Sequence, residues 1–237
     1  MAYLGTRRLV PELLDELSPD DPAAIRSRRD LVLVNALMFQ PPIMARLLRQ
    51  GCSTAPRRLL EIGAGDGRFA LALARRLAKN WPGVEVTLLD RQDLRTDTLA
   101  AAFDRFGWRA RFLVADAFAF AQETDERFDA VYANLFLHHF EDEPLARLLR
   151  LVSNLAPVFA ACEPRRAGFP LLGSRLLWAV GANHVTRHDA PASVRAGFAG
   201  RELTKLWPEG EAQDVTEEAK ALFTQTLLVR PWGNADP

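Results

Sequence analysis

The sequence has only two cysteines and no apolar run of membrane-spanning length. Cys52 and Cys162 lie in different segments without the spacing of metal ligands, so we expect free thiols in a reducing cytoplasm and no metal site. A membrane-spanning helix needs about 20 apolar residues, and the first residues also lack the apolar core of a signal peptide. These absences predict a cytoplasmic protein without a membrane span.

The sequence also has no net charge at pH 7. Lys plus Arg and Asp plus Glu number 30 each, and the basic residues, nearly all of them arginine, form no dense cluster. This balance leaves no electrostatic footprint for nucleic acid, so we expect no nucleic-acid partner. Apolar residues at 49% and charged residues at 25% are close to globular averages, and 237 residues suit one α/β domain with additions.

Short apolar segments alternate with segments of helical periodicity from residue 57 onward. The predicted strands are RRLLEIG, VEVTLLD, RFLVAD, FDAVYANL and PVFAACEP, followed by a terminal strand, ALFTQTLLVR. The predicted helices are residues 68–79, TDTLAAAFDRFG, PLARLLRLVSNLA and residues 194–206. Strand and helix in strict turn predict an α/β fold, in which a parallel sheet has helices on both faces.

Two regions stand outside this alternation. Residues 1–56 have a helical pattern, in which LVLVNALMFQ predicts a buried helix and IMARLLRQG a helix that ends at Gly51. Residues 168–190 form an apolar insertion after the fifth predicted strand. We therefore predict an N-terminal helical extension (1–56) that packs on a core domain (57–237). The insertion is predicted either to pack on the sheet edge or to act as a substrate lid.

A glycine-rich turn, Glu61-Ile62-Gly63-Ala64-Gly65-Asp66-Gly67, follows the first predicted strand. Open parallel sheets bind ligands at the carboxyl ends of their strands, and glycines let a ligand approach the backbone. A dinucleotide fingerprint, G-x-G-x-x-G, would place its last glycine where Arg68 stands, which disfavours an NAD oxidoreductase. The acid before the first glycine suits a ligand that carries an ammonium group rather than a pyrophosphate.

The turn resembles motif I, E-x-G-x-G-x-G, of class I S-adenosylmethionine-dependent methyltransferases. The segment FDAVYANLFLHHF is similar to the F-D-x-V…L-H-H segment of small-molecule methyltransferases, including those of ubiquinone and menaquinone biosynthesis. The resemblance extends from about Arg57 to Pro164. It implies a Rossmann-like, seven-stranded, mostly parallel sheet flanked by helices. It also implies S-adenosylmethionine as cofactor and a small-molecule acceptor.

The resemblance also implies the cofactor contacts, most of which follow successive predicted strands. Asp90 is expected to accept hydrogen bonds from both ribose hydroxyls, although a turn or helix-cap aspartate is the alternative. Asp116 is expected to take the adenine amino group, with the N–H of Ala117 on a ring nitrogen, and Asn134 to lie beside the methionine moiety. The full expected set is Glu61, Gly63, Gly65, Gly67, Asp90, Asp116, Ala117 and Asn134.

His138 and His139 are the candidate catalytic bases, because histidine titrates nearest physiological pH. The alternative is that they cap or pack the following helix, and the sequence identifies no carboxylate to orient either ring. His184 and His188 are secondary candidates.

The acceptor is expected to be a small aromatic or apolar molecule, methylated at oxygen or carbon. The run NHVTRHDAPASVRAGF is similar to bacterial methyltransferases found with polyketide-type pathways that make phenolic lipids. A nucleic-acid base methyltransferase would show Asn/Asp-Pro-Pro-aromatic where this chain has Asn134-Leu135-Phe136-Leu137. A protein methyltransferase and a non-catalytic S-adenosylmethionine-binding scaffold remain open alternatives.

Overall fold

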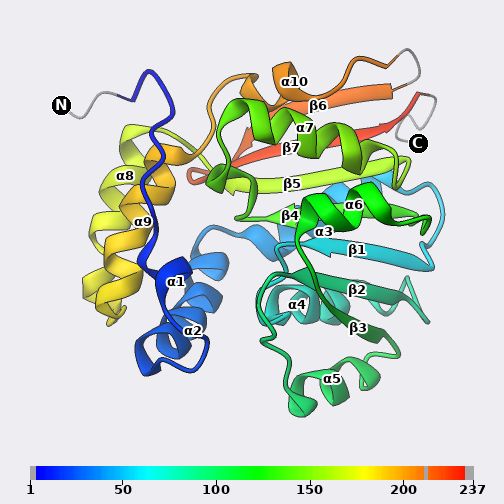
Figure 1. The fold of residues 1–237 in the computed structure, drawn as a ribbon, viewed down its shortest axis with the longest axis horizontal. Coiled ribbons are helices and arrows are strands. Elements are labelled where there is room, and N and C mark those ends of the chain that lie inside the picture. Colours follow the sequence, from blue (N-terminus) through cyan, green and yellow to red (C-terminus); the bar gives the residue numbers. More distant parts are fainter. Residues whose placement is uncertain (1–3, 211–212, 233–237) are drawn as a thin grey trace.

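The computed structural model describes residues 4–210 and 213–232, which contain a seven-stranded sheet with helices on both faces (Figure 1). The strand order is β3-β2-β1-β4-β5-β7-β6, in which β1 to β5 run parallel and β7 is antiparallel to both of its neighbours. The strands are β1 (Arg58–Ile62), β2 (Glu85–Asp90), β3 (Arg109–Val114), β4 (Ala130–Asn134), β5 (Val158–Pro164), β6 (Gln213–Lys220) and β7 (Thr224–Pro231). The predicted α/β fold with a mostly parallel sheet is confirmed.

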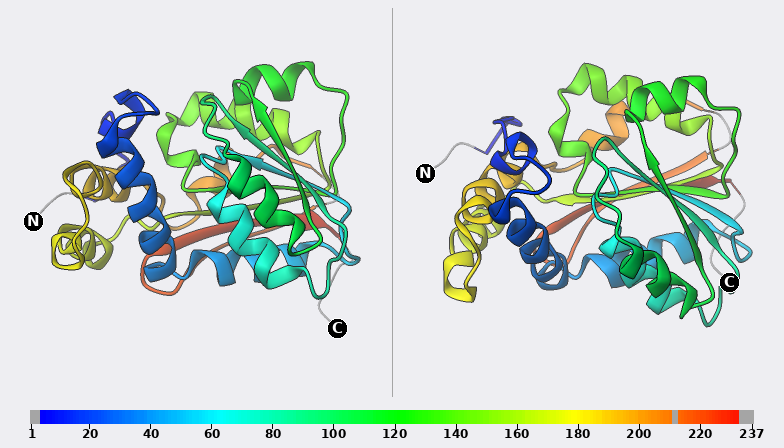
Figure 2. Two further views of the ribbon diagram at one scale, coloured as in Figure 1. Left: turned by 90° about the horizontal axis from the view of Figure 1, so that it is seen from below. Right: turned by 60° about the horizontal axis from the view of Figure 1, so that its bottom comes forward.

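The helices form three groups. One face of the sheet is covered by α3 (Gln40–Gly51), α4 (Arg68–Leu77) and α5 (Asp97–Asp104). The other face is covered by α6 (Ala117–Glu123), α7 (Asp142–Ser153) and α10 (Glu202–Leu206). The third group stands beyond one end of the sheet, with the helices coloured blue and yellow in Figure 2. It consists of α1 (Leu13–Glu16), α2 (Pro22–Leu37), α8 (Gly168–Arg175) and α9 (His184–Ala196), with the short 3-10 turn η2 (Leu177–Val180).

The two faces of the sheet each carry a hydrophobic core. Successive strand residues point to opposite faces, so Leu59 packs with α3 and α4, whereas Leu60 packs with α6 and α7. Both faces are covered, so the central strands need apolar residues at nearly every position. This explains why they appear in the sequence as continuous apolar runs rather than as alternating ones.

The predicted last helix, residues 194–206, is wrong, because two helices occupy this stretch. Helix α9 ends at Ala196 and α10 begins at Glu202. Between them, the chain passes so close to β5 that a Cβ on Gly197 would lie 2.2 Å from the carbonyl oxygen of Pro164. Gly200 then takes a positive φ of 63°, which favours glycine. Because the residues on both sides have helical periodicity, the sequence pattern predicted one continuous helix.

Strand β6 has no counterpart among the predicted segments. Its sequence, QDVTEEAK, is polar because it is an edge strand whose residues are half-buried or exposed. The terminal strand, predicted from residue 221, begins only at Thr224, after a turn in which Ala221 has a φ of 53°.

The prediction that LVLVNALMFQ is a buried helix is also wrong. Residues 31–37 of this segment form the end of α2, in which only Ala24 and Ser27 are buried, while Val32 and Leu37 are exposed. Its last residue, Gln40, begins α3. Helix α2 contacts α9 and α3 at the end of the sheet rather than lying under it. No single helix in the described ranges has the length and hydropathy of a membrane span. Helices α2 and α3 reach that length and hydropathy only when taken together, and the pair is bent by 64°.

Gly51 sets how closely α3 approaches the sheet. A Cβ at this position would lie 2.5 Å from Cγ1 of Val158 and 3.2 Å from Cδ1 of Leu228. We expect Gly51→Ala to lower the free energy of unfolding by about 1–3 kcal/mol through overpacking. The control is Gly168→Ala at the start of α8, where a Cβ meets nothing within 4 Å and the substitution should not destabilise. Urea unfolding with equal midpoints for the two variants would contradict this packing.

Candidate active site

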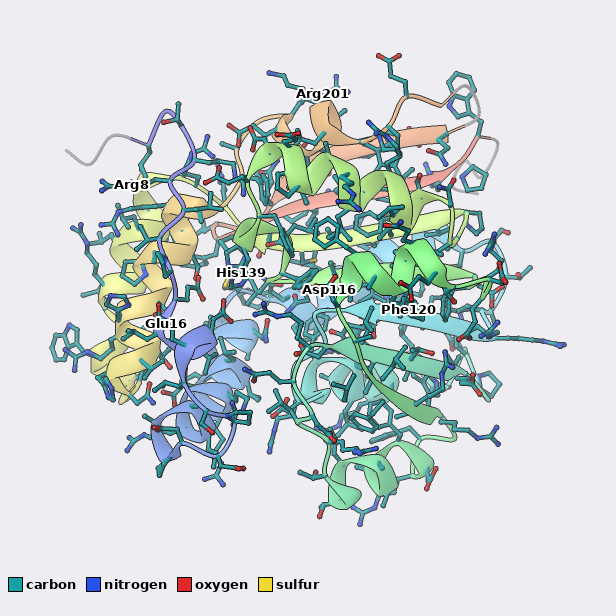
Figure 3. The ribbon with its side chains drawn as sticks, viewed as in Figure 1. Arg8, Glu16, Asp116, Phe120, His139 and Arg201 are labelled. Carbon is teal, nitrogen blue, oxygen red and sulfur yellow. The ribbon has the colours of Figure 1, made fainter. Side chains whose placement is uncertain are left out.

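A cavity of about 790 Å³ opens at the carboxyl ends of the parallel strands. On the side of the sheet it is lined by the glycine turn and by the residues that follow β2, β3 and β4. On the other side it is closed by α2, α8, α9 and residues 9–15. In Figure 3, the labelled Asp116 and His139 lie between the sheet and the helices beyond its end. The cavity is lined by His138, His139 and all of the expected cofactor contacts except Gly67.

The three glycines of the turn have different surroundings. All three have positive φ angles, between 55° and 80°. A Cβ on Gly63 would lie 2.1 Å from the Phe136 ring, and one on Gly67 would lie 2.8 Å from Leu88. A Cβ on Gly65 would meet nothing within 4 Å. Gly63 and Gly67 therefore serve the packing of the chain itself, whereas Gly65 leaves open space in which a ligand fits against the backbone.

Asp90 is both a turn residue and a cavity residue. Its Oδ2 accepts a hydrogen bond from the N–H of Gly65 at 2.8 Å, and its Oδ1 accepts one from the N–H of Gln92 at 2.9 Å. Each carboxylate oxygen can accept further bonds, so two ligand hydroxyls can be added without breaking these contacts. The turn role considered as an alternative is therefore present in the structure, and it leaves capacity for a ligand.

Asp116 caps helix α6. Its Oδ1 accepts hydrogen bonds from the N–H groups of Phe118 and Ala119, at 2.9 and 3.1 Å. Ala117 is the first residue of the helix and is buried beside the cavity. The aspartate cap thus holds the start of α6 at the edge of the cavity.

Asn134, the last residue of β4, carries a buried polar atom in need of a partner. Its Nδ2 donates to Oδ1 of Asn35 on α2 at 2.9 Å. Its Oδ1 is buried and has no hydrogen-bond partner among the described residues. Leaving a buried acceptor unpaired costs free energy, so this oxygen favours a ligand that brings a donor. Asn35 was not predicted, because it is remote in the chain from the motif segments.

Glu61 supplies a buried carboxyl group at the same end of the cavity. It is 1% exposed, and its partner is the Tyr132 hydroxyl, which donates to it at 3.2 Å. Burial raises the pKa of Glu61 well above its ordinary value, and the nearby charges of Asp66 and Asp90 add to this rise. A cationic group placed beside Glu61 would stabilise its ionised form. Arg28 of α2 also lines this region of the cavity.

His138 is held between two carboxylates. It lies in the 3-10 turn η1 (Leu137–His139), and its Nδ1 is 2.7 Å from Glu163 at the end of β5. Its Nε2 is 3.5 Å from Oε1 of Glu12. Burial alone would lower the pKa of His138, but Glu12 and Glu163 together raise it to about 9. Both ring nitrogens face acids, and a pKa of about 9 keeps the ring protonated at neutral pH, which disfavours proton removal from a substrate.

The sequence identified no carboxylate to orient either histidine, but the structure places one beside each ring. Nδ1 of His139 also pairs with an acid, Asp15, at 3.2 Å. Glu163 follows the pattern of acids at strand ends, which could have identified it. No sequence pattern marks Glu12, because it lies in the N-terminal segment and reaches the histidines only in the folded chain. The secondary candidates His184 and His188 do not line the cavity and instead border a separate surface pocket.

The N-terminal strap (residues 4–17) crosses the cavity and is fixed at several points. Asp189 of α9 accepts hydrogen bonds from the N–H groups of Leu13 and Leu14, at 2.8 and 3.0 Å. Arg7 donates to the carbonyl oxygens of Ala196 and Phe140, at 2.9 and 2.8 Å. These contacts make the strap a wall of the cavity, even though it lies far in sequence from the other lining segments.

The chain was compared with protein families and with solved structures. A family profile described as "Methyltransferase domain" matches residues 59–156. No curated protein sequence matches the chain. The plantazolicin methyltransferase BamL, crystallised with a triazolic desmethylPZN analogue and SAH (S-adenosylhomocysteine), is similar in structure. Its TM-score is 0.63 at 11% identity, over 92% of each chain.

Two longer proteins share the fold. An O-methyltransferase family protein from Burkholderia thailandensis has a TM-score of 0.57 at 13% identity, over 91% of this chain and 62% of its own. The mitomycin 7-O-methyltransferase MmcR has a TM-score of 0.55 at 17% identity, over 92% of this chain and 60% of its own. The present chain thus spans about three fifths of these two proteins.

At these identities the structural likeness establishes the fold alone, and the profile match covers less than half of the chain. The matched range contains the glycine turn, Asp90 at the end of β2 and Asp116 after β3. Residues 59–156 thus match a methyltransferase domain, within a chain that has the fold of methyltransferases of known structure.

Proposed function

We propose that the chain is an S-adenosylmethionine-dependent methyltransferase that acts on a small aromatic or apolar acceptor, at oxygen or carbon, inside the cavity described above. The observation that carries the proposal is the continuity of that cavity. It runs from the glycine turn to the histidine pair and to apolar side chains of α2, α8 and the strap. Its volume of about 790 Å³ lies within the roughly 300–1,000 Å³ of small-molecule sites. The methyl donor and a small acceptor would share one enclosed space.

For the donor, we propose the contacts that the motif resemblance implies. Asp90 would hold the ribose hydroxyls, and Asp116 with Ala117 would hold the adenine. Glu61 and the unpaired Oδ1 of Asn134 suit the ammonium group, because one needs a cation and the other a hydrogen-bond donor.

Arg28 is a further candidate for the donor site that the motifs did not indicate. It lies two helical turns before Asn35 on α2, and both residues line the cavity. We propose that its guanidinium pairs with the carboxylate of the methionine moiety.

Methyl transfer needs alignment more than acid–base chemistry. S-adenosylmethionine, when bound, would supply the methyl group from its sulfonium, and a hydroxyl acceptor would react as its anion, its proton already released to solvent. Holding both molecules in line can contribute about 7–11 kcal/mol. The strap, α8 and α9 cover part of this space, and reduced access of water would favour the meeting of an electron-rich acceptor with a sulfonium. A catalytic role for His138 or His139 stays a prediction, and the paired nitrogens of His138 favour positioning over proton removal.

A methyl-transfer assay with radiolabelled S-adenosylmethionine tests the proposed function. The acceptors would be a panel of phenols and quinols, a cell extract and denatured protein. We expect label in the fraction that an organic solvent extracts. Label confined to precipitated protein would indicate a protein methyltransferase instead. Cofactor binding without any transfer to these acceptors would indicate the non-catalytic scaffold.

Substitution of Gly65 tests the proposed cofactor cradle. We expect Gly65→Ala to weaken S-adenosylhomocysteine binding tenfold or more, equivalent to about 1.4 kcal/mol, because the methyl group occupies open ligand space. The matched control is Gly107→Ala, since Gly107 also has a positive φ and open space around its Cα. Both variants carry a left-handed strain of about 1–2 kcal/mol, so their unfolding midpoints should fall similarly. Equal affinities by calorimetry would show that the turn does not hold the ligand.

Glu61→Gln is expected to stabilise the protein at neutral pH. The raised pKa means that the folded protein keeps a proton that the unfolded chain releases above the ordinary value of 4.5. The native state then binds more protons, so stability falls as pH rises from about 4.5 towards the folded pKa. The glutamine removes this loss and keeps an acceptor for Tyr132. Thermal unfolding should show a higher midpoint than wild type at pH 7, with the difference shrinking below pH 4.5.

The same variant should bind S-adenosylhomocysteine more weakly, because the ammonium group loses its carboxylate. Gain of stability together with loss of affinity is what a buried ligand-binding acid produces. A variant that is less stable at pH 7 and binds the ligand as tightly as wild type would contradict this role of Glu61.

A further inference from the structure

We propose that Glu12, His138 and His139 form a binding site for a divalent transition-metal ion. One carboxylate oxygen of Glu12 and one ring nitrogen of each histidine lie within 4.8 Å of one another. All three residues line the cavity. The sequence predicted no metal site, because Glu12 comes from the strap and the histidines from η1, so no ligand spacing exists along the chain.

The distance between Glu12 and His138 fits two ligands of one metal better than it fits a hydrogen bond. Oε1 and Nε2 are 3.5 Å apart, beyond the roughly 2.7–3.2 Å of an N–H···O bond. Two such atoms at about 2.1 Å from a tetrahedral zinc ion would stand about 3.4 Å apart. A metal ion could therefore enter between them with little movement of either side chain.

The surroundings of the histidines resemble those of metal ligands. A histidine that binds a metal usually donates its other ring N–H to a carboxylate, which fixes the orientation of the ring. Nδ1 of His138 is 2.7 Å from Glu163, and Nδ1 of His139 is 3.2 Å from Asp15. In both rings Nδ1 is thus engaged by an acid, which leaves Nε2 for a metal.

A ligand set of two imidazoles and one carboxylate favours transition-metal ions over magnesium and calcium. Imidazole suits zinc, cobalt, nickel and iron, whereas magnesium and calcium prefer oxygen ligands throughout. Three protein ligands leave at least one coordination position for water or for an oxygen of a molecule in the cavity. The competing explanation is a purely structural chain of charges, Glu163–His138–Glu12, that ties the strap to β5 and needs no metal.

A titration with zinc decides between the two explanations. The full-length chain, freed of metal with a chelator, would be titrated with zinc chloride by calorimetry. We expect one equivalent to bind, with no displacement by millimolar magnesium. Glu12→Gln and His139→Ala should each weaken binding by more than the ~10–100-fold loss typical of removing a partner behind a ligand.

The matched control is His188→Ala. His188 also pairs with an acid, Asp189 at 2.9 Å, but it lies outside the cluster and should leave zinc affinity unchanged. Absence of zinc binding, or equal affinity in wild type and both cluster variants, would overturn the proposal. If a cluster variant fails to fold, the cobalt absorption spectrum of the wild-type chain decides instead. A tetrahedral nitrogen–oxygen spectrum supports the site, and a spectrum of hydrated cobalt excludes it. These measurements require no methyl transfer, so their failure would leave the proposed function untouched.

Discussion

The hydrogen bonds to the Glu163 carboxylate are the constraint on which the candidate site depends. Glu163 is fully buried at the end of β5, where an unpaired charge would be prohibitively costly. It accepts bonds from the N–H groups of Phe136 and Leu137, at 3.0 and 2.8 Å, and binds the His138 ring. The chain after β4 is thereby held in a tight turn, in which Leu135 takes a φ of 52°. That turn places Phe136 against Gly63 and His138 against Glu12.

The strap and the helices beyond the sheet turn an open edge into a partly enclosed cavity. A parallel sheet presents its binding edge to solvent unless other segments cover it. Here α2 contributes Asn35 and Arg28, α9 contributes Asp189, and the strap contributes Glu12. Polar contacts at the cofactor end and apolar walls elsewhere suit a charged donor and an apolar acceptor. The exposed apolar residues of α2 follow from this arrangement, since the helix serves the cavity rather than the core.

The sequence predicted those features that depend on local periodicity and on strand ends. The order of β1 to β5, the glycine turn and the positions of Asp90 and Asp116 all follow from patterns within a few residues. Features that depend on long-range contacts were missed. Glu12 and Asn35 reach the site only through the fold, and the polar β6 lacks the apolar signal of a buried strand. The break between α9 and α10 depends on the approach of Gly197 to Pro164, which helical periodicity does not reveal.

We expect the cavity to bind an adenosylated amino acid rather than a dinucleotide. The most direct test is a pair of calorimetric titrations of the wild-type chain, one with S-adenosylhomocysteine and one with NAD. The account predicts one equivalent of S-adenosylhomocysteine bound and no heat of binding for NAD. Saturable NAD binding together with no binding of S-adenosylhomocysteine would contradict it.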